Sequence, residues 1–272
     1  MLTLVPTPLG NLEDITFRAV AALKAAQVVL CEDTRVAKKL LTLLSQKFDI
    51  QFGQKRFLSL HEHNQSLFFQ KISAEFFDSE VVYLSDAGMP GISDPGSVLV
   101  QYAQKHGIDY TVLPGPSAFV TAYVASGFGK RSFCFFGFLP HKGKERSKAL
   151  DEVLSMDRDV VLYESPHRLE KLLEEIAERD PHRELFLAKE LTKLHERYFK
   201  ADASSLLKRL RQEPIKGEWV VVIEGGAHKN HKIELSQEEI MALHLPPKEK
   251  AKLLARSGQR SVKEWYRLLN DS

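Results

Sequence analysis

Residues 85–96 read Ser-Asp-Ala-Gly-Met-Pro-Gly-Ile-Ser-Asp-Pro-Gly, and this stretch decides the fold class. It follows an apolar run at residues 81–84 that predicts a buried strand, and it precedes residues 97–103, whose apolar side chains have helical spacing. Its glycines, prolines and aspartates fix the backbone, let another molecule approach the main chain and supply carboxylates. Because ligands bind at the carboxyl ends of strands in open α/β sheets, this loop is interpreted as a ligand site rather than as a capped turn.

Strand and helix patterns alternate on both sides of this loop, which predicts an α/β protein. In the first half of the chain, apolar strands are expected at residues 2–5, 28–31, 57–60, 81–84 and 110–113. In the second half they are expected at residues 133–136, 160–163, 185–188 and 219–224. The sequence Pro114-Gly115-Pro116 interrupts the periodicity and can continue neither element, so it marks an internal domain boundary.

The composition changes again after Gly226, where a polar linker leads into short helical patterns. The sequence therefore predicts an α/β domain at residues 1–113, a second at residues 114–226 and a helical C-terminal extension at residues 227–272. Between Lys248 and Leu269 the extension carries seven Lys or Arg residues against two Glu residues, so its last stretch is basic.

The overall composition is that of an ordinary soluble protein, with 43% hydrophobic and 27% charged residues in 272. No stretch approaches the roughly 18 apolar residues of a membrane span, and the first residues lack an export signal, so a cytoplasmic protein without membrane contact is expected. Cys31 and Cys134 lie in predicted strands, which favours buried thiols over a disulfide or a zinc site. A net charge of +2 gives no general affinity for nucleic acids.

Several familiar signatures are incomplete in this chain. Residues 127–132 lack the third glycine of a dinucleotide loop and the Gly-Lys-Ser or Gly-Lys-Thr ending of a phosphate loop. The segments that begin at His61 and His195 lack the second histidine of the metalloprotease pattern. No metal is expected, and the pair His61 and His63 is the remaining support for one.

Residues 130–148 form a basic segment, with six Lys or Arg residues against one Glu and interleaved phenylalanines. The phenylalanines are typical of a core strand. The basic residues that follow them predict a flexible, solvated loop beside the ligand cleft, where they would contact RNA phosphates. The RNA-binding candidates of this segment are Lys142, Lys144, Arg146 and Lys148.

Dense polar clusters directly follow four of the predicted strands. They lie at residues 32–35, 61–64, 164–168 and 189–196. One such cluster is typical of a helix cap, whereas four indicate side chains that converge on a shared cleft. A group-transfer enzyme needs this convergence, because it must orient a nucleophile, remove its proton and screen charge.

Six segments together resemble the ribosomal RNA branch of the tetrapyrrole methylase superfamily, and the resemblance covers about residues 2–226 in order. They are residues 5–15, 31–35, 85–96, 113–118, 163–168 and 189–196. The resemblance implies two α/β domains with an S-adenosylmethionine cleft between them, and a homodimer. It further implies 2′-O-methylation of a cytidine in the decoding centre of 16S ribosomal RNA, with the 30S subunit as partner.

Carried over position by position, the resemblance also implies which residues hold the cofactor. The first loop of the cleft would be Pro8, Leu9 and Gly10, and the methionine and ribose parts would contact Ser85, Asp86, Ala87 and Ile92. Further contacts would come from Ser117 and Ala118 at the domain junction, and from Tyr163, Ala188 and the pair Glu218 and Trp219 on the adenine side.

The chemistry itself requires a proton acceptor, because a ribose hydroxyl is a poor nucleophile at neutral pH. The available acceptors at strand ends are Glu190, Lys189, Asp33 and Glu32, and we favour Glu190 assisted by Lys189. His61 and His167 are alternatives that titrate near neutral pH. Flanking phosphates would be held by Arg35, Arg168 and Lys193.

Three other functions remain open at this point. The same fold and cofactor could serve a tetrapyrrole substrate, although such a substrate does not need the basic segments. A non-catalytic RNA-binding or ribosome-assembly protein would bind RNA without the cofactor. A metal-dependent nucleotide hydrolase rests only on His61, His63 and nearby carboxylates.

Overall fold

The computed structural model describes residues 1–129, 132–212, 214–226, 236–256 and 260–270. The chain divides into two compact units, Met1–Ala227 and His228–Ser272, which are described separately below. Within the described residues, no helix is both long and apolar enough to cross a lipid bilayer.

Within residues 1–129, five parallel strands form a sheet in the order β3-β2-β4-β1-β5. The strands are β1 (Leu2–Val5), β2 (Val28–Cys31), β3 (Arg56–Ser59), β4 (Val81–Leu84) and β5 (Tyr110–Val112). β1, β2 and β4 are buried along their whole length, as expected for parallel strands covered on both faces.

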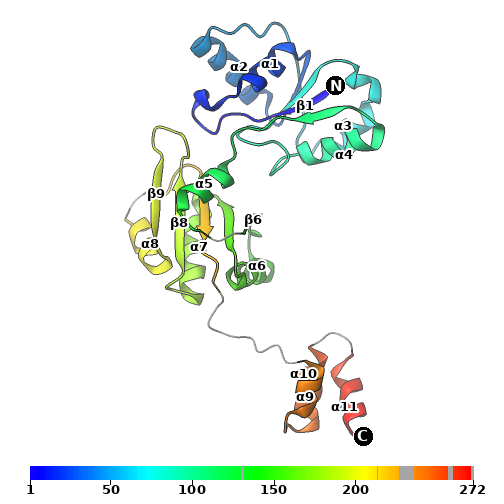
Figure 1. The fold of residues 1–272 in the computed structure, drawn as a ribbon, viewed down its shortest axis with the longest axis vertical. Coiled ribbons are helices and arrows are strands. Elements are labelled where there is room, and N and C mark those ends of the chain that lie inside the picture. Colours follow the sequence, from blue (N-terminus) through cyan, green and yellow to red (C-terminus); the bar gives the residue numbers. More distant parts are fainter. Residues whose placement is uncertain (130–131, 213, 227–235, 257–259, 271–272) are drawn as a thin grey trace. The chain divides into compact units, whose positions relative to one another are not determined.

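Helices cover both faces of this first sheet (Figure 1). They are α1 (Phe17–Ala25), α2 (Thr34–Phe48), α3 (Gln65–Lys71) and α4 (Gly96–His106), with short 3₁₀ helices at Leu12–Asp14 and Ala74–Asp78. One hydrophobic cluster joins α1 and α2 to the sheet, and a second joins α3 and α4 to the opposite face. This doubly wound arrangement places the carboxyl ends of β1, β2 and β4 side by side at one edge.

Within residues 132–226, position 213 aside, five strands form a mixed sheet in the order β6-β7-β10-β8-β9. The strands are β6 (Phe133–Phe138), β7 (Asp159–Glu164), β8 (Glu184–Lys189), β9 (Arg197–Asp202) and β10 (Trp219–Ile223). Only β6 and β7 pair in parallel, and the remaining pairs are antiparallel.

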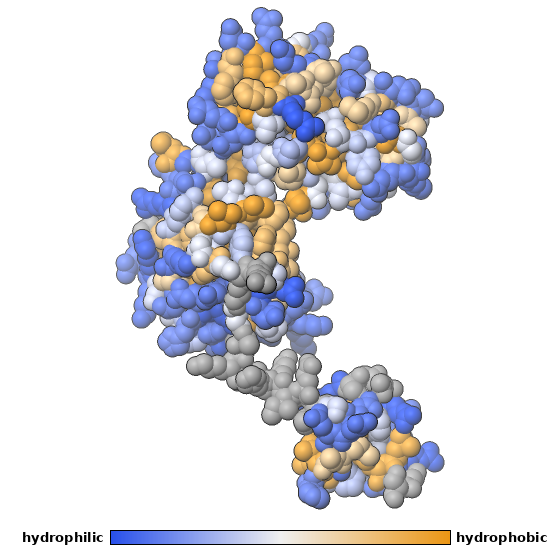
Figure 2. Space-filling view, in the orientation of Figure 1, coloured by the Kyte–Doolittle hydropathy of each residue, from blue (hydrophilic) through white to orange (hydrophobic). Residues whose placement is uncertain are grey.

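The helices of this second part are α5 (Ala118–Ser126), α6 (Gly143–Ser155), α7 (Pro166–Arg179) and α8 (Ala203–Leu210). α5 packs on one face of the sheet, and a separate cluster joins α6, α7 and α8 to the other face. The outer surface of α5 is apolar, since Val120 and Val124 are exposed there, and Figure 2 shows apolar side chains gathered over this helix.

The second unit is helical where it is described, as the sequence predicts. It contains α9 (Gln237–Ala242), α10 (Pro247–Ala255) and α11 (Val262–Asn270). Ser236 and Glu239 form a reciprocal capping box at the start of α9, and Ala251 and Leu254 are fully buried on α10. The predicted linker residues 227–235 lie outside the described part of the chain.

Both cysteines are free thiols, as the sequence predicts. Cys31 ends the buried strand β2, and burial raises the pKa of its thiol to about 12. Cys134 is only partly buried, on β6. Cys31 therefore stays protonated at neutral pH and acts as a small apolar core residue.

Candidate cofactor and catalytic site

Two pockets adjoin where loops of the first sheet face the second sheet. The first, here called the apolar pocket, has a volume of about 360 Å³, and the second, the polar pocket, about 350 Å³. Both are lined by Ala87, Ala118, Phe138, Tyr163 and Glu218. The shared residues make the two pockets parts of one cleft.

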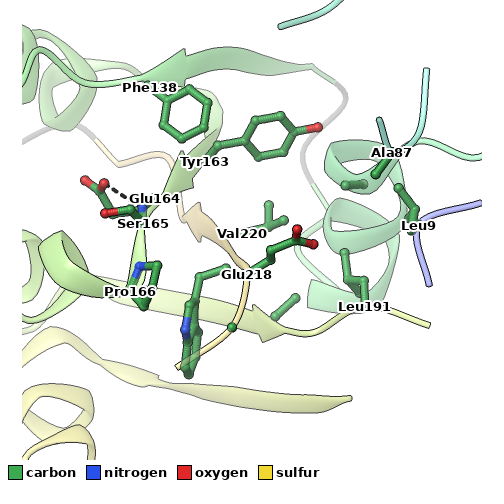
Figure 3. Close-up of a pocket in the computed structure, with 14 residues that line it drawn as sticks. Leu9, Ala87, Phe138, Tyr163, Glu164, Ser165, Pro166, Leu191, Glu218 and Val220 are labelled. Atoms are coloured by element: carbon green, nitrogen blue, oxygen red, sulfur yellow. Dashed lines mark hydrogen bonds between the residues drawn. The ribbon is translucent and has the colours of Figure 1, made fainter. Parts of the chain in front are cut away.

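The apolar pocket is built mainly by the second sheet and by the loops at its edge. Phe138 ends β6 and Tyr163 lies near the end of β7, and their rings meet edge to face with centroids 5.6 Å apart. Figure 3 shows both rings on one wall, with the Tyr163 hydroxyl pointing toward the side where Leu9 and Ala87 lie. Burial raises the pKa of Tyr163 to about 12, so the phenol is neutral. Flat apolar walls of this kind suit an aromatic base.

The rest of the apolar pocket comes from scattered positions. Its remaining lining residues are Leu9, Glu164, Ser165, Pro166, Ala188, Leu191, Gly217, Trp219 and Val220. Of these, Leu9 belongs to the loop after β1, whereas the others belong to the second sheet and its loops. The pocket therefore depends on both halves of the first unit.

The polar pocket is built around the loop between β4 and α4, which is the stretch at residues 85–96. Asp94 organises this loop: its carboxylate accepts hydrogen bonds from the main-chain amides of Gly91 at 2.9 Å and Gly96 at 2.8 Å. Gly88 and Gly91 adopt left-handed φ angles of 82° and 89°, which explains why glycine occupies these positions. Asp94 and the two glycines thereby fix the shape of the loop that lines the polar pocket.

The loop after β1 pairs with this stretch. Thr7 and Gly88 exchange two main-chain hydrogen bonds of 3.0 Å, and Ser85 donates its hydroxyl to the carbonyl of Gly88 at 2.7 Å. Two strand-end loops of the first sheet are thus locked together at the cleft.

Carboxylates give the polar pocket a negative character. Glu32, directly after β2, lines it together with Asp86 and Asp94. Burial, followed by the neighbouring carboxylates of Asp94 and Asp86, raises the pKa of Glu32 to about 7. Burial is also the main cause that raises the pKa of Asp86. A cationic ligand group would relieve this repulsion, so the polar pocket favours positive charge.

The predicted cofactor residues lie in this cleft with two exceptions. Leu9, Ala87, Ala118, Tyr163 and Ala188 line the apolar pocket, and Ser85, Asp86, Ala87, Ile92, Ser117, Ala118 and Tyr163 line the polar one. Pro8 and Gly10 line neither pocket. Gly10 packs instead against Lys193, where a Cβ atom would lie 2.2 Å from the lysine Cγ.

The predicted catalytic pair has a different environment from the one expected. Glu190 has a left-handed φ of 53°, and its Oε1 accepts hydrogen bonds from the Glu218 amide at 2.8 Å and from Lys193 Nζ at 3.0 Å. Burial opposes ionisation, but these hydrogen bonds outweigh it and lower the pKa of Glu190. Glu190 lines neither pocket and is a weakened base, so we withdraw its interpretation as the proton acceptor.

Lys189 and Arg35 also lie outside the two pockets. The Lys189 ammonium lies over the Trp219 ring, 5.4 Å from its centroid. The Arg35 side chain is 89% exposed and pairs with Asp33 at 2.6 Å. This pairing lowers the pKa of Asp33 to about 2, which also makes Asp33 a poor proton acceptor.

Two predicted RNA contacts, Arg146 and Arg168, belong to an ion cluster around Glu164. The interpretation of the buried Arg146 as a phosphate ligand is wrong, whereas that of Arg168, whose side chain is 21% exposed, stays a prediction. The Arg146 side chain is 2% exposed and bonds Glu175 at 2.8 Å and Glu164 at 3.5 Å. Arg168 bonds Glu164 at 2.9 Å and donates to the Leu139 carbonyl at 2.7 Å. Glu164, which both arginines contact, also lines the apolar pocket beside Ser165 and Pro166 (Figure 3).

The other basic candidates are on the surface. Lys142 precedes α6 as its N-cap residue, and Lys144 and Lys148 lie one helical turn apart on α6, all three exposed. Residues 143–148 therefore form a helix and not the flexible loop expected from the sequence. The role of these lysines in binding RNA stays a prediction.

Two of the histidine candidates, His61 and His63, lie near the edge of the first sheet. The His61 and His63 rings meet edge to face with centroids 5.9 Å apart. Neither they nor His167 line the two pockets. Among the described residues, no group of three or more His, Cys, Asp or Glu side chains is placed to hold a metal ion.

Comparison with known proteins agrees with this architecture. Residues 1–207 match the model of the family described as tetrapyrrole (corrin/porphyrin) methylases. A Campylobacter fetus protein named ribosomal RNA small subunit methyltransferase I is 44% identical, with 99% of each chain covered. A Helicobacter pylori protein of the same name is also 44% identical, over 100% of this chain and 99% of that one.

A solved structure shares the fold. The uroporphyrin-III C-methyltransferase of Thermus thermophilus superposes with a TM-score of 0.56 at 19% identity, covering 82% of this chain and 94% of that one. The chain therefore belongs to the tetrapyrrole methylase family and, within it, to the group of ribosomal RNA small subunit methyltransferase I proteins.

Proposed function

We propose that this chain transfers the methyl group of S-adenosylmethionine to the ribose 2′ oxygen of a cytidine in the decoding centre of 16S ribosomal RNA. The observation that carries the proposal is the near-complete match, at 44% identity, to relatives named for ribosomal RNA methylation, together with a cleft suited to this cofactor.

The chemistry of the cleft fits S-adenosylmethionine. Adenine is a flat ring system, which suits the walls formed by Phe138 and Tyr163 in the apolar pocket. The sulfonium and ammonium groups are cations, which suit the carboxylates of the polar pocket. When bound, the cofactor supplies an electrophilic methyl group on a positively charged sulfur.

The residues of the chain would supply binding and alignment. The locked loops after β1 and β4 would hold the cofactor, and the apolar walls would exclude water from the reacting groups. Fixing the 2′ oxygen in line with the methyl group turns a bimolecular step into an effectively unimolecular one. No protein group has to bond covalently to the substrate.

RNA binding would use exposed positive charge. The candidates are Lys142, Lys144 and Lys148 near α6 and the basic residues of α10 and α11.

We further propose that the substrate is the RNA within the 30S subunit, that the chain acts in the cytoplasm, and that it works as a homodimer. Light scattering of the purified chain would test the dimer directly.

The function is tested by offering labelled S-adenosylmethionine with alternative acceptors. The acceptors are 30S subunits that lack their own methyl groups, naked 16S RNA and a reduced tetrapyrrole. Transfer to RNA alone supports the proposal. Transfer to the tetrapyrrole alone would replace the substrate while keeping the fold, and cofactor binding without transfer to any acceptor would contradict the proposal.

A further inference from the structure

The proton acceptor can be sought among the carboxylates that line the cleft. Among the described residues these are Glu32, Asp86, Asp94, Glu164 and Glu218. A general base has to reach the reacting hydroxyl and must be free to take up its proton. Each of the five can be judged by these two requirements.

Three of them are occupied by fixed partners. Asp94 accepts the amides of Gly91 and Gly96 and thereby shapes the central loop. Glu164 is buried between two arginines and also accepts the Ser165 amide at 2.9 Å. Glu218 pairs with Lys193 at 3.0 Å. Protonating Asp94 or Glu164 would break contacts that shape the cleft, and protonating Glu218, whose side chain is 74% exposed, would break its ion pair with Lys193.

Glu32 and Asp86 remain. Glu32 accepts a hydrogen bond from the Asp86 amide and Asp86 accepts one from the Asp33 amide, and the positions of the two carboxylates differ. Asp86 adjoins Ala87, which lines both pockets, and its side chain is exposed to the cleft. It is therefore placed to face the cationic part of a bound cofactor. Glu32 follows the neighbouring strand β2, lines only the polar pocket and is partly buried. Glu32 therefore borders the pocket in which the sulfonium group, and with it the methyl group, is proposed to lie.

We propose that Glu32 is the general base of the methyl transfer, a role that rests on the function proposed above. The ribose 2′ oxygen attacks the methyl carbon, and the carbon–sulfur bond breaks with its electron pair passing to sulfur. The hydroxyl proton passes to the Glu32 carboxylate, which later releases it to solvent. The sulfonium becomes a neutral thioether, so charge and atoms balance.

The surroundings of Glu32 support this role. The carboxylates of Asp86 and Asp94, from the loop after β4, and of Glu62, from the loop after β3, all act on Glu32 in addition to burial. Although a hydrogen bond from the Asp86 amide acts in the opposite direction, they hold its pKa near 7, where a carboxylate is a sufficiently strong base and is about half ionised at neutral pH. A cation bound beside Glu32 would lower that pKa and keep the carboxylate ionised, as a proton acceptor must be.

The test compares Glu32→Gln with Asp86→Asn and with the control Glu80→Gln in the full chain. Glu32→Gln should lower kcat by about 10² to 10⁴ while leaving affinity for S-adenosylhomocysteine within about threefold. Asp86→Asn should mainly weaken cofactor binding. Glu80 is exposed directly before β4, at the opposite end of that strand from the cleft, and lines neither pocket, so Glu80→Gln should keep kcat within about threefold.

A second measurement does not depend on turnover. If S-adenosylmethionine lowers the Glu32 pKa, binding near pH 7 releases protons, and calorimetry in buffers of different ionisation enthalpy measures that release. The Glu32→Gln variant should release fewer protons than the wild type, and Glu80→Gln should match the wild type. The rise of kcat/KM with pH, centred near 7, should also vanish in Glu32→Gln.

The outcomes separate the two proposals. An active wild type with an equally active Glu32→Gln variant, or unchanged proton release, overturns the role of Glu32 alone. A large kcat loss accompanied by an equal loss of cofactor affinity assigns Glu32 to binding and also overturns it. A wild type that binds cofactor without methylating RNA overturns the proposed function, and with it the reaction in which Glu32 would act.

Discussion

At the scale of single residues, Glu32 is held where ionisation is unfavourable. Its pKa in the folded chain, about 7, exceeds the ordinary value of 4.5, so the folded state binds protons more tightly than the unfolded state. Stability should therefore fall as the pH rises from 4.5 to 7. The raised pKa that suits Glu32 to act as a base therefore lowers the free energy of unfolding at neutral pH, and such a cost is common at active sites.

The Glu32→Gln variant should consequently be more stable than the wild type above pH 7. One pKa unit corresponds to about 1.4 kcal/mol, and partial solvent screening reduces the effect, so we expect a gain of about 1 to 2 kcal/mol at pH 8. Below pH 4.5 the gain should disappear. Urea denaturation at the two pH values measures it, and a Glu32→Gln variant that is less stable at pH 8 would contradict the account.

Arg146 has a structural role of a different kind. Its buried guanidinium joins Glu164 and Glu175 behind the apolar pocket. Arg146→Ala should destabilise the chain by about 3 to 5 kcal/mol, because it removes the arginine partner of Glu175 and one of the two arginine partners of the buried Glu164. The exposed Lys144 on the same helix is the matched control, and Lys144→Ala should stay within about 0.5 kcal/mol of the wild type. Equal, small effects would show that Arg146 is no more than a surface charge.

At the scale of elements, Glu190 ties the end of β8 to the start of β10. It accepts the Glu218 amide, donates its own amide to the Glu218 carbonyl at 2.9 Å and pairs with Lys193. The same loop reaches the first sheet, since the Asn11 amide donates to Thr192 Oγ1 at 3.1 Å. Glu190 is therefore a positioning residue for one wall of the cleft.

Glu190→Gln should accordingly change binding more than chemistry. The amide oxygen can still accept from Glu218, but the ion pair with Lys193 is lost, so we expect cofactor affinity to fall by up to about tenfold, or roughly 1.4 kcal/mol. We expect kcat to stay within about threefold. A kcat loss of about 10² or more with intact binding would restore Glu190 as the base.

Gly217 provides an independent check of the role of the Glu190 contacts. Its φ is +83°, and a Cβ atom there would lie 2.6 Å from Glu190 Oε1. Gly217→Ala should therefore disturb the same wall without touching a charge, and should weaken cofactor binding in the same direction as Glu190→Gln. If Gly217→Ala binds the cofactor as tightly as the wild type does, the contacts of Glu190 do not contribute to cofactor binding.

The elements also show what sequence patterns can and cannot predict. The buried strands β1, β2 and β4 occupy the predicted residues, because continuous apolar runs bounded by turn residues are a local signal. β3 begins and ends one residue earlier than predicted, although the Leu60 amide still donates to the Cys31 carbonyl just beyond the strand. Arg146 was misinterpreted because its partners Glu164 and Glu175 are distant in sequence.

Part of the site could be predicted because local sequence patterns also indicate where loops lie. Residues of the central loop, such as Ser85 and Asp86, line the cleft because loop position and strand order follow from local pattern. Phe138 was missed because nothing in an aromatic-rich strand indicates which ring faces a ligand. The choice between Glu190 and Glu32 depends on hydrogen bonds and burial that only the folded chain supplies.

At the scale of the whole molecule, positive charge lies in both compact units despite a net charge of only +2. Lys142, Lys144 and Lys148 are exposed in the first unit, and Lys248, Arg256 and Lys263 are exposed in the second. Charges of this kind bind phosphates with release of counterions, so their contribution to affinity is measured by its salt dependence.

Replacing the three basic residues of the first unit with Gln, and separately those of the second unit, should test which unit binds RNA. Each phosphate contact that is lost should reduce the slope of log affinity against log salt by about 0.7 to 0.9. We expect both sets to lower the slope for 30S binding while leaving cofactor affinity unchanged. Filter binding at several salt concentrations measures this, and a set that leaves the slope unchanged is not at the RNA interface.

The central claim is methyl transfer to a ribose of ribosomal RNA, and mapping the methyl group tests it most directly. The wild-type chain would be incubated with labelled S-adenosylmethionine and unmethylated 30S subunits, and the RNA then hydrolysed with alkali. A 2′-O-methyl group blocks cleavage at its nucleotide, so we predict that the label is recovered in one alkali-resistant dinucleotide that contains 2′-O-methylcytidine. Label on a nucleobase, or cofactor binding with no label in RNA, would contradict the account.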